Sequence, residues 1–139
     1  MKQQLVLPMA FYVFYIFGLL LLNVRVRKTA IKSGRMDVRY FKTYRGDGAP
    51  DEVIVMGRHY DNQFQLPMLF LITCITYLAM DAVTSLTLIL AWAFVVSRLV
   101  HSAVHLGRNH ILKRMTAFGA GWVVLAVLWL ELVFKSFAS

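Results

Sequence analysis

The chain has 139 residues, of which 59% are hydrophobic and 16% are charged, and its net charge is +8. It is too apolar for an ordinary soluble domain and long enough for about four membrane spans of ~20 residues each. The positive charge does not indicate a nucleic-acid partner, because the basic residues lie between apolar runs, where membrane proteins hold their cytoplasmic loops. We therefore predict an all-α membrane protein, a four-transmembrane-helix bundle formed as a single domain by residues 1–139.

The first transmembrane helix is predicted over residues 5–23, because Leu5 to Leu22 carries no charge and basic residues follow it. A cleavable signal peptide is the competing interpretation, since Lys2 precedes the apolar run. No small-x-small cleavage site follows the run, so we keep it as a span. A basic loop on the membrane surface is then predicted over residues 24–51, with a turn signal from Gly46 to Pro50.

The second transmembrane helix is predicted over residues 52–80, and its first half is polar. Its purely apolar part, Leu66 to Met80, is too short to cross a bilayer alone at ~1.5 Å per residue, so the polar residues before it must lie at membrane depth. Arg58, Asn62 and Gln65 fall at i, i+4 and i+7 and therefore share a helix face. Polar side chains at this depth face a bundle interior or a cavity, so the face predicts a binding site.

Pro67 stands inside this second predicted helix. Because proline has no backbone N–H, the carbonyl of Gln63 would lose its usual donor and stay open as an acceptor beside the polar face. The alternative is a simple kink without a role in binding. Both interpretations keep one helix over residues 52–80.

The third transmembrane helix is predicted over residues 82–107 and carries a second polar face. Arg98, His101 and His105 fall at i, i+3 and i+7, so their side chains lie on one side of the helix. This face is at the same membrane side as the polar face of the second helix. Two polar faces at one side strengthen the prediction of a binding site there.

The fourth transmembrane helix is predicted over residues 115–135, directly after Arg114. Nearly all Lys and Arg residues lie in the loops after the first and third spans or in the helix ends beside them, whereas the turn after the second span holds only Asp81. The positive-inside rule therefore places both basic loops in the cytoplasm and both termini outside. Both polar faces would then open to the cytoplasm.

Two catalytic classes fit the polar residues poorly. His101 and His105 have the spacing of a metal-binding pair, but no Glu follows His101 as it does in zinc proteases. A di-iron oxygenase would need a larger histidine set, and only His59 and His110 remain, so we predict no metal site. A serine hydrolase is disfavoured because no serine of the third helix has a nucleophile-elbow context.

The polar residues suit an anionic, amide-rich small molecule instead. Four arginines accompany the amide and imidazole side chains of the two faces, and guanidinium groups bind carboxylates in bidentate fashion. These arginines are Arg58, Arg98, Arg108 and Arg114. Cys74, the single cysteine, lies in an apolar run and is interpreted as a small core residue, not as a nucleophile.

The helix plan and the two polar motifs resemble the MAPEG superfamily, the membrane-associated proteins in eicosanoid and glutathione metabolism. The resemblance covers nearly the whole chain and is to bacterial-type members similar to microsomal glutathione transferase. It rests on Arg58-x3-Asn62-x2-Gln65 before Pro67, on Arg98-x2-His101-x3-His105, and on Arg114. It implies a homotrimer that binds glutathione at the cytoplasmic side, between neighbouring subunits.

The resemblance also implies roles for single residues. Arg58 and Asn62 match the family's glutathione-contacting Arg and Asn, and Arg114 matches the arginine that holds the thiolate. Gln65 stands where many members have Glu, which changes the contact to the glutathione amino group. The expected glutathione-binding set is Arg58, Asn62, Gln65, Arg98, His101 and His105, with Arg114 as the catalytic residue.

We therefore expect a glutathione-binding membrane protein that acts as a glutathione transferase or peroxidase on lipophilic electrophiles. The alternative is a catalytically silent membrane subunit or binding protein on the same scaffold. The expected location is a bacterial inner membrane. The expected partners are lipid, a lipophilic small-molecule substrate and further copies of the chain.

Overall fold

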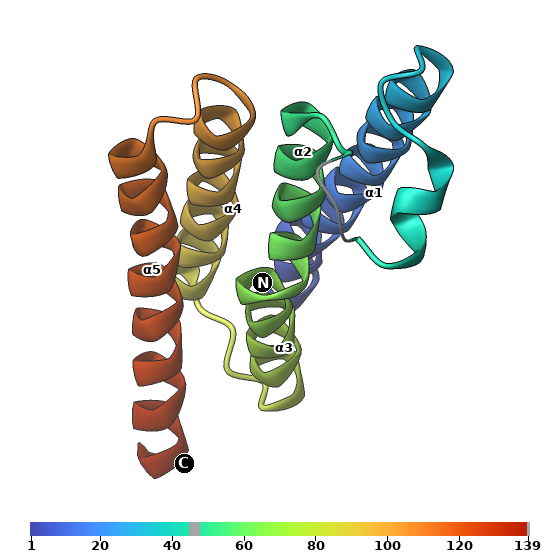
Figure 1. The fold of residues 1–139 in the computed structure, drawn as a ribbon. Coiled ribbons are helices and arrows are strands. Elements are labelled where there is room, and N and C mark those ends of the chain that lie inside the picture. Colours follow the sequence, from blue (N-terminus) through green and yellow to red (C-terminus); the bar gives the residue numbers. More distant parts are fainter. Residues whose placement is uncertain (45–47, 139) are drawn as a thin grey trace.

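The computed structural model describes residues 1–44 and 48–138, and every regular element in this part of the chain is a helix (Figure 1). The elements in order are α1 (Lys2–Lys32), the 3-10 turn η1 (Val38–Lys42), α2 (Asp51–Asp61), the 3-10 turn η2 (Asn62–Phe64), α3 (Leu66–Ala79), α4 (Ser85–Leu106) and α5 (Ile111–Ala138). The turn predicted from Gly46 to Pro50 lies partly outside the described residues. The all-α prediction is confirmed.

Three of these helices are long and apolar enough to cross a membrane: Lys2–Lys32, Ser85–Leu106 and Ile111–Phe137. Their outward faces carry apolar side chains such as Phe14, Leu21 and Phe134, which are each at least 70% exposed. Contiguous exposed apolar surface of this kind is a liability in water and is the normal state of a helix in lipid. The structure therefore describes an integral membrane protein.

The helix predicted over residues 52–80 is interrupted, and this expectation needs correction. The chain leaves helical geometry at Gln65, whose φ and ψ are −103° and −102°, between η2 and α3. Pro67 explains the interruption, because it lacks an N–H and its ring would clash with the carbonyl four residues earlier. At the second position of α3 the missing donor has no cost. Neither an open carbonyl in a continuous helix nor a simple kink describes this arrangement.

The loops are shorter than predicted, because α1 and α5 are longer. α1 continues to Lys32 and stops at Gly34, whose φ is +69° and whose N–H bonds to the carbonyl of Ile31 at 3.0 Å. A glycine in the left-handed region is the usual end of a helix. The predicted loop over 24–51 therefore begins with about two turns of helix. α5 begins at Ile111, four residues before the prediction, so Arg114 lies on its first turn.

The third helix begins later than predicted, at Ser85 and not at residue 82. Asp81 has a φ of +53°, which a continuing helix does not allow. Thr84 then caps α4, since its side-chain oxygen accepts from the N–H of Thr87 at 3.2 Å while the Thr87 hydroxyl accepts from its N–H at 3.2 Å. This reciprocal pairing satisfies donors that a helix start would otherwise leave open.

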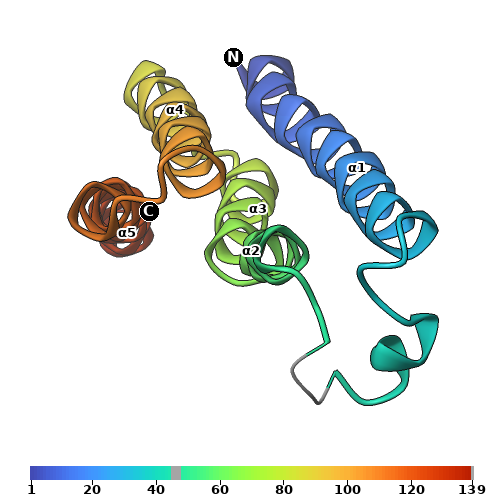
Figure 2. The same ribbon diagram turned by 45° about the horizontal axis from the view of Figure 1, so that its top comes forward.

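α2 and α3 lie between α1 and the α4–α5 pair in both views (Figure 2). The rings of Phe70 and Phe94 stack at 4.3 Å, with Tyr12 against both, and so join α1, α3 and α4. The α1–α2 and α4–α5 connections lie at one end of the molecule. The α3–α4 turn is joined to both ends of the chain: Lys2 pairs with Asp81 at 2.5 Å, and Nζ of Lys135 donates to the carbonyl of Ala82 at 2.7 Å.

Candidate functional site

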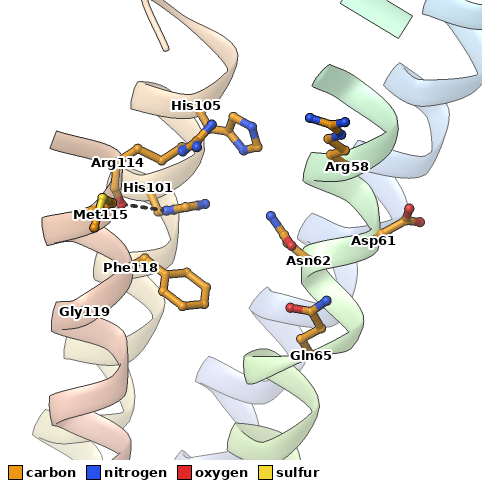
Figure 3. A pocket seen from close by; sticks show the side chains of 10 residues that line it. All are labelled: Arg58, Asp61, Asn62, Gln65, His101, His105, Arg114, Met115, Phe118 and Gly119. Carbon is orange, nitrogen blue, oxygen red and sulfur yellow. Dashed lines mark hydrogen bonds between the residues drawn. The ribbon is translucent and has the colours of Figure 1, made fainter. Parts of the chain in front are cut away.

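A cavity of about 600 Å³ lies between α2 on one side and α4 and α5 on the other (Figure 3). This volume is within the range of small-molecule sites. Its walls are formed by Arg58, Asp61, Asn62, Gln65, His101, His105, Arg114, Met115, Phe118 and Gly119. The cavity lies toward the end of the molecule that holds the α4–α5 connection.

Six of the seven predicted site residues line this cavity. They are Arg58, Asn62, Gln65, His101, His105 and Arg114. The two polar motifs therefore face one another across a single space, although the second helix is not continuous. Asn62 begins the short 3-10 turn η2 and Gln65 is the residue at the break, so the interruption changes their register but leaves them on the cavity side.

Arg98 is the seventh predicted residue and lies behind the cavity wall. It is fully buried, and its guanidinium carbon is 5.2 Å from the centre of the Phe118 ring. None of its three guanidinium nitrogens has a hydrogen-bond partner among the described residues. A buried cation without a counter-charge is unfavourable, and an anion in the neighbouring cavity would relieve it.

Arg114 is held in place by the connection between α4 and α5. Its Nη1 donates to Oδ1 of Asn109 at 2.9 Å, and Asn109 has a φ of +48°. Asparagine is among the few residues that tolerate this left-handed conformation. Nδ1 of His101 lies 3.3 Å from the carbonyl oxygen of Arg114, which joins the polar face of α4 to the first turn of α5. Arg114 is therefore a partly buried and oriented cation.

Two buried polar residues beside the cavity, His59 and Gln63, are absent from the predicted set. Both side chains are fully buried. Oε1 of Gln63 accepts from the hydroxyl of Tyr12 on α1 at 2.6 Å, and its Nε2 donates to the carbonyl of His59 at 2.8 Å. The available signal was their i, i+4 spacing, which predicts a second polar face on α2. Arg58, Asn62 and Gln65 form the more polar face of the same segment and dominate its pattern.

The charge around the cavity is positive. Arg58 and Arg114 line it, and Arg98 lies behind Phe118. The only carboxylate in its lining is that of Asp61, which points away from the other side chains in Figure 3. Among the described residues, none of these three arginines takes part in an ion pair, since the pairs found join other groups. The cavity therefore favours an anionic ligand.

Comparison with known proteins identifies the family. No curated protein matches the chain closely enough to count as a relative. A family model does match it, and the match extends over residues 5–134, from the start of α1 to near the end of α5. It includes every residue that lines the cavity. The chain belongs to the MAPEG family.

Proposed function

We propose that the cavity binds glutathione and that the protein uses this thiol as a glutathione transferase or peroxidase on lipophilic electrophiles. The MAPEG family includes glutathione transferases and peroxidases, and its members generally use glutathione. The observation that carries the proposal is that Arg58 and Arg114 line one cavity, with Arg98 buried behind its Phe118 wall, and that none of the three pairs with a carboxylate among the described residues. Glutathione supplies two carboxylates, two amides and a thiol, which such a cavity can bind.

The α2 side of the cavity suits the carboxylate and amide groups of the tripeptide. Arg58 offers a forked cation, while Asn62 and Gln65 each offer an amide that donates and accepts. These side chains bind and orient the ligand. Their orientation across the cavity leaves the α4–α5 side for the sulfur (Figure 3).

Arg114 is proposed to stabilise the thiolate. A thiol with a pKa of ~8.5 is only a few per cent ionised at neutral pH, and lowering that pKa by about two units requires about 2.7 kcal/mol of differential stabilisation. Arg114 is partly buried and oriented by Asn109, and it lies on the first turn of α5, where the helix dipole also favours negative charge. One oriented cation at a helix start can supply stabilisation of this size.

The assembly and the orientation in the membrane are part of the proposal. A homotrimer would place a neighbouring subunit against the open side of the cavity, and a mass of three chains in mild detergent is expected. The loops at residues 33–50 and 107–110 would face the cytoplasm of a bacterial inner membrane, as the positive-inside rule requires. An apolar electrophile would then reach the thiolate from the lipid.

Thiolate absorbance tests the proposal directly. The full-length protein in detergent is titrated with glutathione at neutral pH, and saturable growth of thiolate absorbance is expected. The protein's own Cys74 is buried in the core and should not contribute. Binding without thiolate formation would identify the silent binding protein instead. Absence of both would refute the glutathione site.

A further inference from the structure

Three histidines from two helices converge beside the cavity. His59 comes from α2, and His101 and His105 come from α4. All three are buried, with at most 4% of their surface exposed. One ring nitrogen from each lies within 4.8 Å of the others. The prediction of no metal site rested on the missing Glu after His101 and on the small number of histidines, whereas the fold places His59, from a different helix, beside the pair on α4.

The separation of these nitrogens is close to that of a metal site. Zn²⁺ binds imidazole at ~2.0–2.1 Å, so two nitrogens of a tetrahedral site lie about 3.3 Å apart. Nδ1 of His59 and Nδ1 of His105 are 3.1 Å apart. All three nitrogens lie within 4.8 Å of one another, so the third nitrogen is at most about 1.5 Å farther from the other two than in a tetrahedral site.

The lone pairs that a metal needs are also present. Nδ1 of His101 lies 3.3 Å from the carbonyl of Arg114, and when it donates there, Nε2 is left as an acceptor. This Nε2 is buried and has no hydrogen-bond partner among the described residues. A ring N–H donated to a main-chain carbonyl is the usual way in which proteins orient a metal-binding histidine. Nε2 of Gln63 can only donate and lies 3.4 Å from Nε2 of His59, so the proton of His59 is on Nδ1, which donates it to Nδ1 of His105 at 3.1 Å. A metal ion bound at these two Nδ1 atoms displaces that proton.

We propose that His59, His101 and His105 bind a divalent transition metal ion of the zinc type, with a fourth position open to the cavity. His101 and His105 line the cavity, so a ligand in it can reach the metal. Arg58 and Arg114 line the cavity together with His101 and His105, and Arg98 precedes His101 by three residues on the same face of α4. These cations oppose a bare dication and favour one that carries an anion, such as hydroxide or a thiolate, in the fourth position.

Cobalt titration tests the site without glutathione, so its outcome is independent of the glutathione proposal. The metal-free full-length protein, purified without a histidine tag, is titrated with Co²⁺ in detergent. We expect one Co²⁺ per chain with the intense visible bands of four-coordinate geometry, displaced by Zn²⁺. Zn²⁺ should also raise the Tm of the unmutated protein in a concentration-dependent way, and a chelator should reverse the shift.

Single substitutions assign the ligands. His59→Ala and His105→Ala should each weaken Co²⁺ binding by more than about 100-fold, because even changes outside the ligand set cost 10–100-fold. The matched control is His110→Ala, which removes an exposed histidine from the α4–α5 connection and should leave binding unchanged. Three results would overturn the proposal. The unmutated protein could give no Co²⁺-dependent signal, or it could give only the weak spectrum of six-coordinate Co²⁺. The third is an unchanged Co²⁺ affinity in His59→Ala. The measurements on the unmutated protein decide the question even where a variant does not fold.

Discussion

The hydroxyl of Tyr77 on α3 lies 2.8 Å from the carboxylate of Glu131 on α5 and 2.8 Å from the carbonyl oxygen of Leu128. The same carboxylate accepts from the Thr84 hydroxyl at 3.0 Å and pairs with Lys135 at 2.7 Å. This polar cluster joins α3, the start of α4 and α5 at the end of the molecule away from the cavity. The two ends therefore have separate polar networks, one at the α3–α4 turn and one around the cavity.

Tyr77→Phe should destabilise the protein while leaving ligand binding intact. The variant removes the hydroxyl that donates to the buried carbonyl oxygen of Leu128. The free energy of unfolding is expected to fall by about 1–3 kcal/mol. Thermal unfolding in detergent measures it. Tyr60→Phe is the matched control, because the Tyr60 hydroxyl has no hydrogen bond among the described residues. Equal Tm values for both variants would show that the cluster contributes no stability.

Arg58→Ala should weaken glutathione binding and change the bound thiol little. The variant removes the cation of the α2 wall, and a charged hydrogen bond contributes about 1.5–3 kcal/mol. Calorimetric titration gives the affinity. Arg39→Ala removes an exposed cation of η1 outside the cavity lining and should bind normally. A loss of equal size in both variants would mean that only the overall charge matters.

Arg114→Ala should instead act on ionisation of the sulfur. The pKa of the bound thiol is expected to rise toward its value in water, so the thiolate fraction falls at neutral pH and recovers as the pH is raised. Turnover at neutral pH should fall by about 10- to 100-fold, with partial recovery at higher pH. A full pH–rate profile distinguishes this from a loss of affinity. If Arg108→Ala, outside the cavity lining, abolishes turnover and Arg114→Ala does not, the assignment is wrong.

Asn109→Gly should reproduce part of the Arg114 effect. Glycine adopts the +48° φ of this position without strain, so the variant removes the side-chain acceptor of Arg114 and keeps the backbone. Loss of one hydrogen bond of about 1 kcal/mol predicts about a five-fold fall in turnover at neutral pH. The pH–rate profile should shift in the same direction as that of Arg114→Ala. An unshifted profile would show that Asn109 does not orient the guanidinium.

The orientation in the membrane can be tested by cysteine labelling in intact cells. Lys42→Cys in η1 should react with an impermeant reagent only after the membrane is opened, whereas Asp81→Cys in the α3–α4 turn should react from outside. Both positions are exposed, and the native Cys74 is buried and provides the unreactive background. Labelling of Lys42→Cys from outside would reverse the proposed topology.

Much of the cavity was predictable, because positions on one helix face follow from spacing alone. His101 and His105 follow from the period of α4 alone, and the distribution of cations indicates that this end of α4 lies at the same membrane side as Arg58. Arg98 has the same period but lies behind the cavity wall, because side-chain packing and not spacing decides which residues of a face reach a cavity. The approach of His59 to His105 was not predictable, since it depends on how α2 and α4 are rotated and crossed.

The interruption at Gln65 illustrates a second limit of sequence reasoning. Pro67 predicts that the helix is disturbed, but it does not predict whether the helix kinks or breaks. The outcome depends on whether neighbouring groups form hydrogen bonds with the backbone groups that lose their helical partners. That answer comes from tertiary contacts. α1 is longer than the predicted 5–23 because the prediction followed the apolar run and ended where basic residues begin. These basic turns contain no residue that ends a helix before Gly34.

The 14 residues of α3 extend for about 21 Å, whereas the hydrocarbon core of a typical bilayer is about 30 Å thick. α1, with 31 residues, exceeds that thickness. The protein thus presents unequal hydrophobic lengths to lipid on its different sides. Acyl chains beside α3 must shorten or tilt, and the membrane surface there should dip toward Gln65 and the cavity.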